Sequence, residues 1–409
     1  MKDETVSLPV QALGRGAGLT AVTVAAAHGL NDLYAAFLHP LLPRIMDKLG
    51  LTIALAALLT TTLTIASSLL QPVMGFLADR WGSRSFVIVG PLLSGVFMSL
   101  IGTAPNLAVL MGVLVLGGLG SAAFHPPGAS MAVRMEAGGA SGLRYSLFSF
   151  GGSAGFAVGP LFAVAWVAAF GLDRLWLAMV PALVLVPALL RLLPATPPSP
   201  SARVPSMRTL LTLFAGPLGL VFGISIVSTF VQRVFLTMEP IAANAAGAPE
   251  AVGALTLSIY LAGQAAGSLL GGYLTDRMER GRLLALLTLA SLPTHLTALA
   301  AAPGSATSLV AAAFAGCAAM AVMPPIVVTA QEQMPTGTAV GSGIAMGLAW
   351  AIGSMGVLAT GVLGDAIGAR GAALVSIPAI LLATPLALHP ALRLGPRALR
   401  LTPTPGPSV

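Results

Sequence analysis

The chain has 409 residues, of which 56% are hydrophobic and 8% are charged, and its formal net charge is +7. A soluble domain carries roughly 25% charged residues, so this composition excludes an ordinary soluble surface and indicates a chain embedded in lipid. The 20 Lys and Arg residues are scattered singly through short loops, which argues against a nucleic-acid partner, and the single cysteine, Cys317, excludes a disulfide within the chain.

Twelve apolar runs are long enough to cross a bilayer, which takes about 20 helical residues. They lie near residues 18–42, 52–77, 85–103, 106–133, 143–169, 173–193, 209–238, 252–274, 283–302, 306–331, 338–363 and 370–391. We therefore predict an all-α membrane protein with 12 transmembrane helices in two six-helix bundles. Its predicted parts are an N-terminal tail (1–17), a first bundle (18–193), a Pro-rich linker (194–208), a second bundle (209–391) and a C-terminal tail (392–409).

An even number of spans places both termini on one side of the membrane. On the opposite side, or in helices close to it, lie five basic residues: Arg44, Lys48, Arg174, Arg233 and Arg370. The other 15 of the 20 Lys and Arg residues fall on the side of the termini. Cytoplasmic loops carry the excess of basic residues, so both termini are predicted to be cytoplasmic.

The first span keeps a polar group in an apolar run. Asp32 lies well inside it, and His28 lies one helical turn earlier on the same face. A charge in mid-bilayer costs at least ~2.5 kcal/mol, which favours function over a polar cluster that merely pins the span to its neighbours. We predict that Asp32 and His28 share a transported proton, and that Asn31 and Tyr34 contact the substrate.

His125 in the fourth span precedes two prolines, Pro126 and Pro127. Prolines lack the backbone N–H, so we expect the helix to break there and its freed carbonyls to line a cavity. His125 is therefore a candidate for both proton coupling and substrate binding. A histidine that is simply hydrogen-bonded is the alternative.

The fifth span places Gly151, Gly155 and Gly159 on one helical stripe, which allows close approach of a neighbouring helix. Pro160 follows and is expected to bend the helix, so Gly155, Gly159 and Pro160 form a predicted helix-bend motif. Phe148, near the start of this span, is a substrate candidate, with packing as its plainer role.

Gln232 and Arg233 in the seventh span are the substrate candidates of the second half. A guanidinium there can bind a phosphate, phosphonate or carboxylate, or it can extend to the outer surface. His295 in the ninth span is predicted to be structural, and His39, at a span end, to be exposed to water.

The segment from Gly75 to Arg84 returns in degraded form from Gly272 to Arg282, each time in a short charged gap between two spans. Other landmarks recur in register. Asp79 pairs with Asp276 at an offset of 197, whereas Pro126 pairs with Pro324, and Gly155 with Gly353, at an offset of 198. The chain is therefore predicted to be a parallel duplication of six spans, with the substrate bound between the halves.

The pattern of Gly75, Asp79, Arg80, Gly82 and Arg84 resembles the cytoplasmic signature of the major facilitator superfamily. The resemblance implies a latch in which the carboxylate of Asp79 meets the start of the eleventh span, near residues 337–339, where a helix N-terminus would stabilise it. The predicted latch residues are Gly75, Asp79, Arg80, Arg84, Asp276 and Arg277. Alternatively, Arg80 and Arg84 only serve the topology.

Further short stretches point to one branch of that superfamily. They are His28-Gly29-Leu30-Asn31-Asp32, Leu69-Leu70-Gln71-Pro72, Phe124-His125-Pro126, Ser146-Leu147-Phe148, Gly151-Gly152 and Gly159-Pro160. Together they resemble the fosmidomycin resistance protein family, which implies proton-driven export of a phosphonate-like or other small drug across the bacterial inner membrane. Many drug/proton antiporters carry an Arg in the fourth span, but residues 110–120 hold no charge here. Coupling must then rest on Asp32, His28 and His125.

The sequence thus predicts a proton-coupled exporter of a small molecule that works as a monomer, whose partners are its substrate, protons and membrane lipid. It shows no nucleophile elbow, no metal-spaced His/Cys cluster and no cofactor-binding loop, so we predict no enzyme activity, no metal and no cofactor. An importer or facilitator of a metabolite is the nearest alternative. The direction of proton movement on adding substrate separates the two. A receptor that binds without transporting is a third reading, and it predicts saturable binding without flux.

Overall fold

The computed structural model describes residues 15–134, 141–195, 212–333 and 343–393, and all regular structure in these ranges is helical. Ten stretches are long and apolar enough to cross a membrane. One of them, Met346–Ala387, holds two crossings, because the chain turns at Gly368, whose φ of 79° is left-handed. With α1 (Arg15–Ala35), which at about 1.5 Å per residue is also long enough to cross, these stretches make the twelve predicted spans.

The N-terminal half comprises eight α-helices and two short 3₁₀-helices. They are α1 (Arg15–Ala35), α2 (Leu38–Leu49), α3 (Ile53–Ser68), α4 (Gln71–Trp81), α5 (Ser83–Ser99), η2 (Leu100–Thr103), α6 (Leu107–Arg134), α7 (Ser141–Phe170), η3 (Leu172–Met179) and α8 (Val180–Leu192). Several of these helices join end to end into single spans. For example, α3 and α4 are separated only by Leu69 and Leu70, just before Pro72 at the start of α4.

The C-terminal half repeats this order. Its helices are α10 (Pro217–Ala245), α11 (Glu250–Thr275), α12 (Arg280–Ala300), α13 (Ala306–Ala321), α14 (Met323–Gln333), η4 (Gly343–Leu348), α16 (Ala349–Ser376), η5 (Ile377–Leu382), α17 (Ala383–Ala387) and η6 (Pro390–Leu392). The predicted linker, residues 194–208, lies almost entirely outside the described residues, so the predicted domain boundaries remain predictions.

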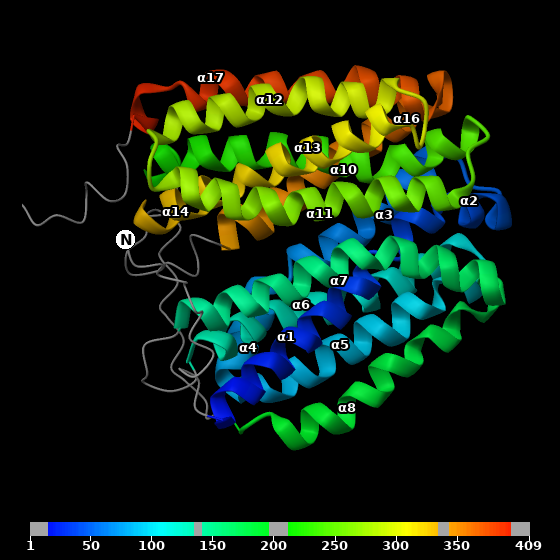
Figure 1. Cartoon of the computed structure of the whole chain (residues 1–409), viewed down its shortest axis with the longest axis vertical. Coiled ribbons are helices and arrows are strands. Elements are labelled where there is room, and N and C mark those ends of the chain that lie inside the picture. Colours follow the sequence, from blue (N-terminus) through cyan, green and yellow to red (C-terminus); the bar gives the residue numbers. More distant parts are fainter. Residues whose placement is uncertain (1–14, 135–140, 196–211, 334–342, 394–409) are drawn as a thin grey trace, which may run out of the picture.

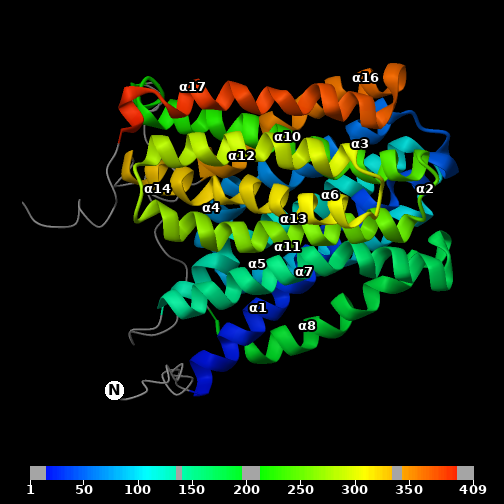
Figure 2. The same ribbon diagram turned by 45° about the horizontal axis from the view of Figure 1, so that its top comes forward.

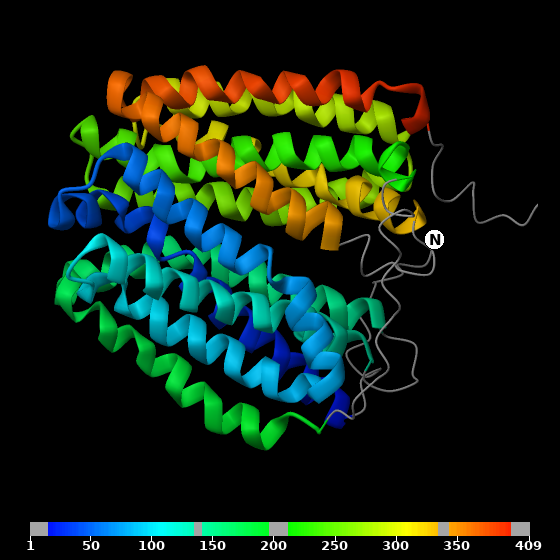
Figure 3. The same ribbon diagram turned by 180° about the vertical axis from the view of Figure 1, so that it is seen from behind.

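The two halves form two bundles that lie side by side (Figure 1). We call the end at which α1 begins the proximal end and the end at which α3 begins the distal end. In Figure 1 the bundles come together at the distal end and diverge toward the proximal end. Figure 2 shows α8 at the outer edge of the N-terminal bundle, where it packs on α1 and α5. Figure 3 shows α3 of one bundle running beside α16 of the other.

The buried apolar side chains divide in the same way as the bundles. One core cluster joins both halves and includes Phe37 and Leu41 of α2 together with Phe235 and Ile241 of α10. The other two clusters each belong to one half. One contains Phe124 and its neighbours in the N-terminal bundle. A shared core at the distal end and separate cores elsewhere mean that the bundles are packed together distally.

Two local expectations about helix ends are wrong. The double proline does not break the fourth span, because α6 runs without interruption from Leu107 to Arg134. The prolines still remove the backbone N–H groups that would bond the carbonyls of Ala122 and Ala123. In the C-terminal half the equivalent prolines follow a real break, between α13 and α14.

His39 is also not exposed to water. The chain continues past the predicted end of the first span as α2, and this buries His39 to 4% exposure, with its Nε2 lacking a hydrogen-bond partner. The predicted seventh span, 209–238, is displaced as well, since α10 runs to Ala245 and takes in Glu239.

Candidate functional site

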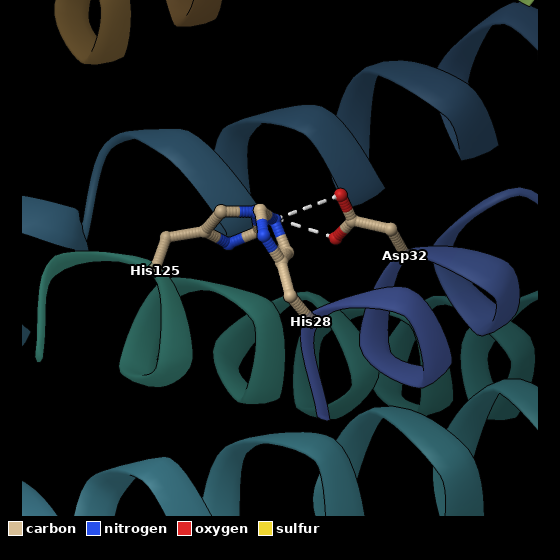
Figure 4. A group of neighbouring side chains, drawn as sticks. All are labelled: His28, Asp32 and His125. Atoms are coloured by element: carbon tan, nitrogen blue, oxygen red, sulfur yellow. Dashed lines mark ion pairs between the residues drawn. The ribbon is translucent and has the colours of Figure 1, made fainter. Parts of the chain in front are cut away.

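His28 and Asp32 meet on α1 as their four-residue spacing predicts. His28 Nε2 lies 3.1 Å from Asp32 Oδ2. His125 reaches the same carboxylate from α6, with its Nε2 3.3 Å from Asp32 Oδ1. Figure 4 shows both imidazoles directed at the one carboxylate. The three residues predicted for proton coupling therefore form one group, which we call the triad.

Each imidazole of the triad is held by a backbone carbonyl on its far side. His28 Nδ1 lies 2.8 Å from the carbonyl oxygen of Phe148, and His125 Nδ1 lies 2.8 Å from that of Ser121. A carbonyl oxygen can only accept a hydrogen bond, so Nδ1 is the donor in both rings. In the neutral form of each ring, Nε2 then carries a lone pair, and it is Nε2 that faces Asp32.

This arrangement requires protons. An ionised carboxylate is also only an acceptor, so each Nε2···Oδ contact is a hydrogen bond only if a proton lies in it, on the imidazole or on the carboxylic acid. With two protons both contacts are satisfied and the triad carries +1. With one proton the triad is neutral. With none, three acceptors face one another and the group carries a negative charge inside the membrane, which is costly.

Polar neighbours fix the carboxylate. Asn31 Nδ2 donates to Asp32 Oδ1 at 2.9 Å, and Asn31 Oδ1 accepts from Ser94 Oγ at 2.8 Å. The hydroxyl of Ser121 lies 3.5 Å from Asn31 Nδ2 and 3.3 Å from His125 Nδ1. Asn31 is fully buried, so in this conformation it positions Asp32 and is not open to a substrate.

The residues packed around the triad cover His28 more completely than His125. Phe148 stacks on His28 with ring centroids 4.0 Å apart, and Phe124 lies 5.4 Å away. A Cβ on Gly152 would overlap the His28 ring, so the absence of a side chain there makes room for it. Side-chain exposure rises from 9% for His28 to 17% for Asp32 and 29% for His125. His125 is thus the member that a substrate or water can reach most easily.

The ligand atoms of the triad, one from each residue, lie within 4.8 Å of one another. They are close enough to hold a single cation between them, and a proton is one such cation. Among the described residues this is where His, Cys, Asp and Glu side chains gather in that way. The packing role predicted for Phe148 is present in its stacking on His28, and at 4% exposure it is nearly closed to a substrate.

Tyr34 does not join the triad. Its side chain is fully buried, and its hydroxyl donates to the carbonyl oxygen of Ala178 at 2.6 Å. Its ring fills the space beside Gly95. We therefore assign Tyr34 to packing within the N-terminal bundle and no longer to substrate binding.

The C-terminal half contributes a second polar group. Gln232 Oε1 accepts from Gln264 Nε2 at 3.0 Å, and Gln232 Nε2 donates to the carbonyl oxygen of Ala319. Arg233 lies near Tyr260, and none of the ion pairs between described residues involves it. A guanidinium inside the protein without a carboxylate partner is suited to bind an anion.

His295 has the structural role that its isolation in the sequence predicts. It is fully buried, its Nε2 lies 3.2 Å from the hydroxyl of Tyr260, and its Nδ1 lies 2.7 Å from the carbonyl oxygen of Ser291. No carboxylate contacts it among the described residues.

The glycine stripe of the fifth span packs α7 against α1. A Cβ at Gly155 would overlap the carbonyl oxygen of Gly29, and one at Gly159 would come within 2.5 Å of the carbonyl oxygen of Leu33. Pro160 lies inside α7, which continues to Phe170. The stripe thereby holds α7 against the helix that carries His28 and Asp32.

The predicted latch residues lie at the proximal end. Gly75 faces Pro126 across a tight contact, Asp79 is half-buried and Arg80 is exposed near the end of α4. Arg84 donates to the carbonyl oxygen of Leu190, which ties α5 to α8. The predicted partner segment, residues 337–339, lies outside the described residues, so the latch remains a prediction.

In the second copy of the Gly75–Arg84 motif, the Arg277 side chain contacts the end of the helix that precedes it. Asp276 follows directly after α11, and the Arg277 guanidinium lies 3.6 Å from the centre of the Tyr273 ring and donates to the Tyr273 carbonyl oxygen at 3.1 Å.

Two further acidic residues have contacts that the sequence pattern does not predict. Glu239 is 5% exposed, its Oε2 lacks a hydrogen-bond partner, and it lines a small cavity with Ser308 and Arg370. Asp365 bonds to backbone N–H groups of the other bundle. Both lie just beyond predicted span ends, where an acidic residue reads as part of a loop.

Comparison with known proteins gives the family. The family model of the Major Facilitator Superfamily matches twice, over residues 24–223 and 220–408. The fosmidomycin resistance protein of Escherichia coli (strain K12) is 27% identical over 362 residues, which cover 84% of this chain and 85% of that protein. The uncharacterized MFS-type transporter YfnC of Bacillus subtilis (strain 168) is 27% identical over 394 residues, covering 90% and 91%.

Solved structures agree on the fold. A bacterial homolog of the human lysosomal transporter Spinster, in an inward-facing and occupied conformation, has a TM-score of 0.75 at 16% identity, covering 95% of this chain and 98% of that one. The nucleoside transporter NupG has a TM-score of 0.75 at 14% identity, covering 90% and 99%. The chain therefore belongs to the Major Facilitator Superfamily and is an integral membrane transporter, not an enzyme.

Proposed function

We propose that the protein is a proton-coupled exporter of a small molecule, of a phosphonate-like or similar drug class, in a bacterial inner membrane. Its termini lie in the cytoplasm, and its bundles rock to expose the site to each side in turn. The observation that carries the proton coupling is the triad, in which two imidazoles with donating Nδ1 atoms direct Nε2 at one carboxylate. The name of the Escherichia coli relative, a resistance protein, supports export.

Exchange requires that substrate and proton exclude one another. His125 is the most exposed member of the triad. A substrate group that donates a hydrogen bond to its Nε2 would occupy the position that the proton takes when the triad is loaded. Substrate arriving from the cytoplasm would thereby release a proton to that side, and a proton arriving from outside would release the substrate there.

The positive charge of the doubly protonated triad also supports a second candidate function, the import of an anion together with protons. An anion that has no hydrogen to donate, and that approaches the doubly protonated triad with Arg233 on the other bundle, binds best while the protons are present. Such a substrate would travel together with its proton, and the protein would be an importer. The two candidates thus predict opposite proton movements at the same residues.

The test begins with cells that express the protein or its Asp32→Asn variant, grown against a panel of toxic compounds that includes phosphonates. A compound tolerated only with the wild-type protein is then added to vesicles that hold a pH indicator. Export by exchange predicts that protons move opposite to the substrate, and co-transport predicts that they move with it. Asp173→Asn is the matched control, because Asp173 is an exposed carboxylate that pairs with Lys48 at the distal end. Undiminished pH-driven transport by Asp32→Asn would remove Asp32 from the mechanism.

A further inference from the structure

Polar contacts tie the two bundles together at the distal end. The carboxylate of Asp365, on α16, accepts hydrogen bonds from backbone N–H groups at the start of α3. Thr61 Oγ1 on α3 donates to the carbonyl oxygen of Ser354 on α16 at 3.0 Å. Both contacts must break if the bundles separate at this end. Opening at the distal end therefore requires that Asp365 release the start of α3.

Asp365 completes the N-terminus of a helix in the other bundle. The first N–H groups of any α-helix have no partner within the helix. In α3, Thr52 Oγ1 accepts from Leu55 N at 3.3 Å, whereas Asp365 Oδ1 accepts from Ile53 N at 2.7 Å and from Ala54 N at 3.3 Å. A carboxylate at a helix N-terminus also interacts favourably with the helix dipole. The contact is thus directed and charge-assisted.

Glycines bring Asp365 into range. A Cβ on Gly361 would lie 2.6 Å from the Cβ of Ala57, and one on Gly364 would lie 2.7 Å from Cγ2 of Ile53. Real side chains at these positions would push α16 away from α3. The close approach of the two helices, seen in Figure 3, therefore depends on the residues that precede Asp365.

A second pair of contacts crosses between the bundles at the same end. Arg44 Nε on α2 lies 2.5 Å from Glu250 Oε1 on α11, and Thr237 donates to Thr60 at 3.1 Å. The Arg44 side chain is 43% exposed, so this ion pair contributes little by itself. Asp365 instead accepts from two backbone N–H groups at the start of α3, at a helix N-terminus that also stabilises a negative charge, so we take it as the main contact at this end.

We propose that Asp365 is a distal latch that holds the bundles closed at this end and must release before the site can open there. It mirrors the latch predicted for Asp79. Asp79 lies at the end of the span formed by α3 and α4 and is predicted to meet the start of the eleventh span. Asp365 lies near the end of the eleventh span and meets the start of α3. Together with the predicted Asp79 latch, this pair of spans would carry a carboxylate latch at each end, of which only one can be engaged when the bundles rock. The proposal rests on the proposed function in requiring that rocking, but not on its proton coupling or substrate.

The test measures the distal opening directly. Spin labels are placed on Thr103→Cys and Asn244→Cys, two exposed distal positions on different bundles, in a Cys317→Ser background. Double electron–electron resonance then gives the fraction of molecules with a long distal distance. Asp365→Asn removes the charge but keeps an oxygen that can accept a hydrogen bond, and Asp365→Ala removes both. We expect the open fraction to rise about threefold in Asp365→Asn and about tenfold in Asp365→Ala.

Asp173→Asn is the control, because it removes a carboxylate at the same end whose ion pair with Lys48 stays within one bundle. Its distances should match those of the wild type. An unchanged distribution in both Asp365 variants, or an equal rise in the control, would overturn the latch. These distances are measured without substrate or a pH gradient. Failure of the latch therefore leaves the proton-coupling proposal standing, and loss of coupling in Asp32→Asn tests that proposal alone.

Discussion

The two halves keep the same packing residues but place different chemistry at their centres. Gly155 of α7 packs on the backbone of α1, and a Cβ on its repeat partner, Gly353 of α16, would lie 2.6 Å from the Ile226 carbonyl oxygen on α10. At the same offset of 198, the triad residues His28, Asp32 and His125 correspond to Ile226, Phe230 and Met323. Duplication has therefore preserved how the first and fifth spans of each half meet, while apolar residues stand in the C-terminal half at the positions that correspond to the triad.

The C-terminal half has its own polar residues, and they differ in kind. Gln232 and Gln264 bond to one another, His295 bonds to Tyr260, and Arg233 has no carboxylate partner among the described residues. In our proposal this half binds and orients an anion, and its described residues show no carboxylate–imidazole contact that could hold a proton. The difference supports our proposal that one bundle handles the proton and the other recognises the substrate.

The largest expected effect comes from removing both imidazoles of the triad. The double variant His28→Gln with His125→Gln should abolish pH-driven transport, because a glutamine side chain forms hydrogen bonds but does not carry a proton. Transport in vesicles under an imposed pH gradient measures it. His295→Gln removes a fully buried imidazole from the other half and should retain coupling. Loss of coupling in His295→Gln, with its folding verified, would end the division of labour between the halves.

A smaller but still large effect is expected from Gly152→Ala, because the added Cβ would overlap the His28 ring and push it off Asp32. Loss of one charge-assisted hydrogen bond should lower pH-driven transport about tenfold or more. Gly112→Ala is the matched control, since nothing lies within 4 Å of a Cβ at that helical glycine. Equal transport rates in the two variants would mean that the position of His28 does not matter.

Arg233→Gln tests the role of the C-terminal half. It should raise the substrate concentration for half-maximal transport about tenfold for an anionic substrate, through loss of a hydrogen bond to a charged group, and leave proton binding intact. Arg233→Lys keeps the charge but loses the bidentate hydrogen-bonding geometry of the guanidinium. Its substrate concentration for half-maximal transport should lie between those of the wild type and Arg233→Gln. The prediction fails if Arg233→Gln affects coupling and not apparent affinity.

The smallest effect is expected for Ser94→Ala, which removes the hydroxyl that donates to Asn31 Oδ1 at 2.8 Å. Asn31 would still reach Asp32, so the loss of about 1 kcal/mol should appear as a change of a few-fold in the transport rate. Thr62→Ala, which deletes a hydroxyl that bonds only within its own helix, should have no effect on coupling. A larger loss in Thr62→Ala than in Ser94→Ala would contradict the positioning role.

The features that depend on a single helix could be predicted from the sequence. Long apolar runs revealed the spans, and the i, i+4 spacing of His28 and Asp32 placed them on one face. The glycine stripe correctly indicated a close helix neighbour. The approach of His125 to the same carboxylate could not be derived, because it depends on how α6 is rotated against α1, and an all-apolar span gives no periodicity from which to read that rotation.

Errors arose where a span was assumed to end. His39 is predicted to be exposed to water because the predicted first span ends at residue 42, whereas α2 continues to Leu49 and His39 is buried. Glu239 and Asp365 were passed over because they follow the predicted ends of their spans. Tyr34 was placed near the substrate because it lies close to Asp32 in sequence, yet it faces Ala178 and the interior of its own bundle. In each case tertiary packing, and not local sequence, decided the outcome.

Proton coupling through the triad depends most on Nδ1 being the protonated nitrogen of both imidazoles when the rings are neutral. Nitrogen NMR of histidine-labelled protein reports this directly, with His28→Gln and His125→Gln used to assign the two rings. We expect Nδ1 to carry a proton in both rings and the Nε2 signals of both rings to change in Asp32→Asn, because each Nε2 faces that carboxylate. Neutral rings protonated at Nε2, with unprotonated Nδ1 and no response to Asp32→Asn, would contradict this mechanism.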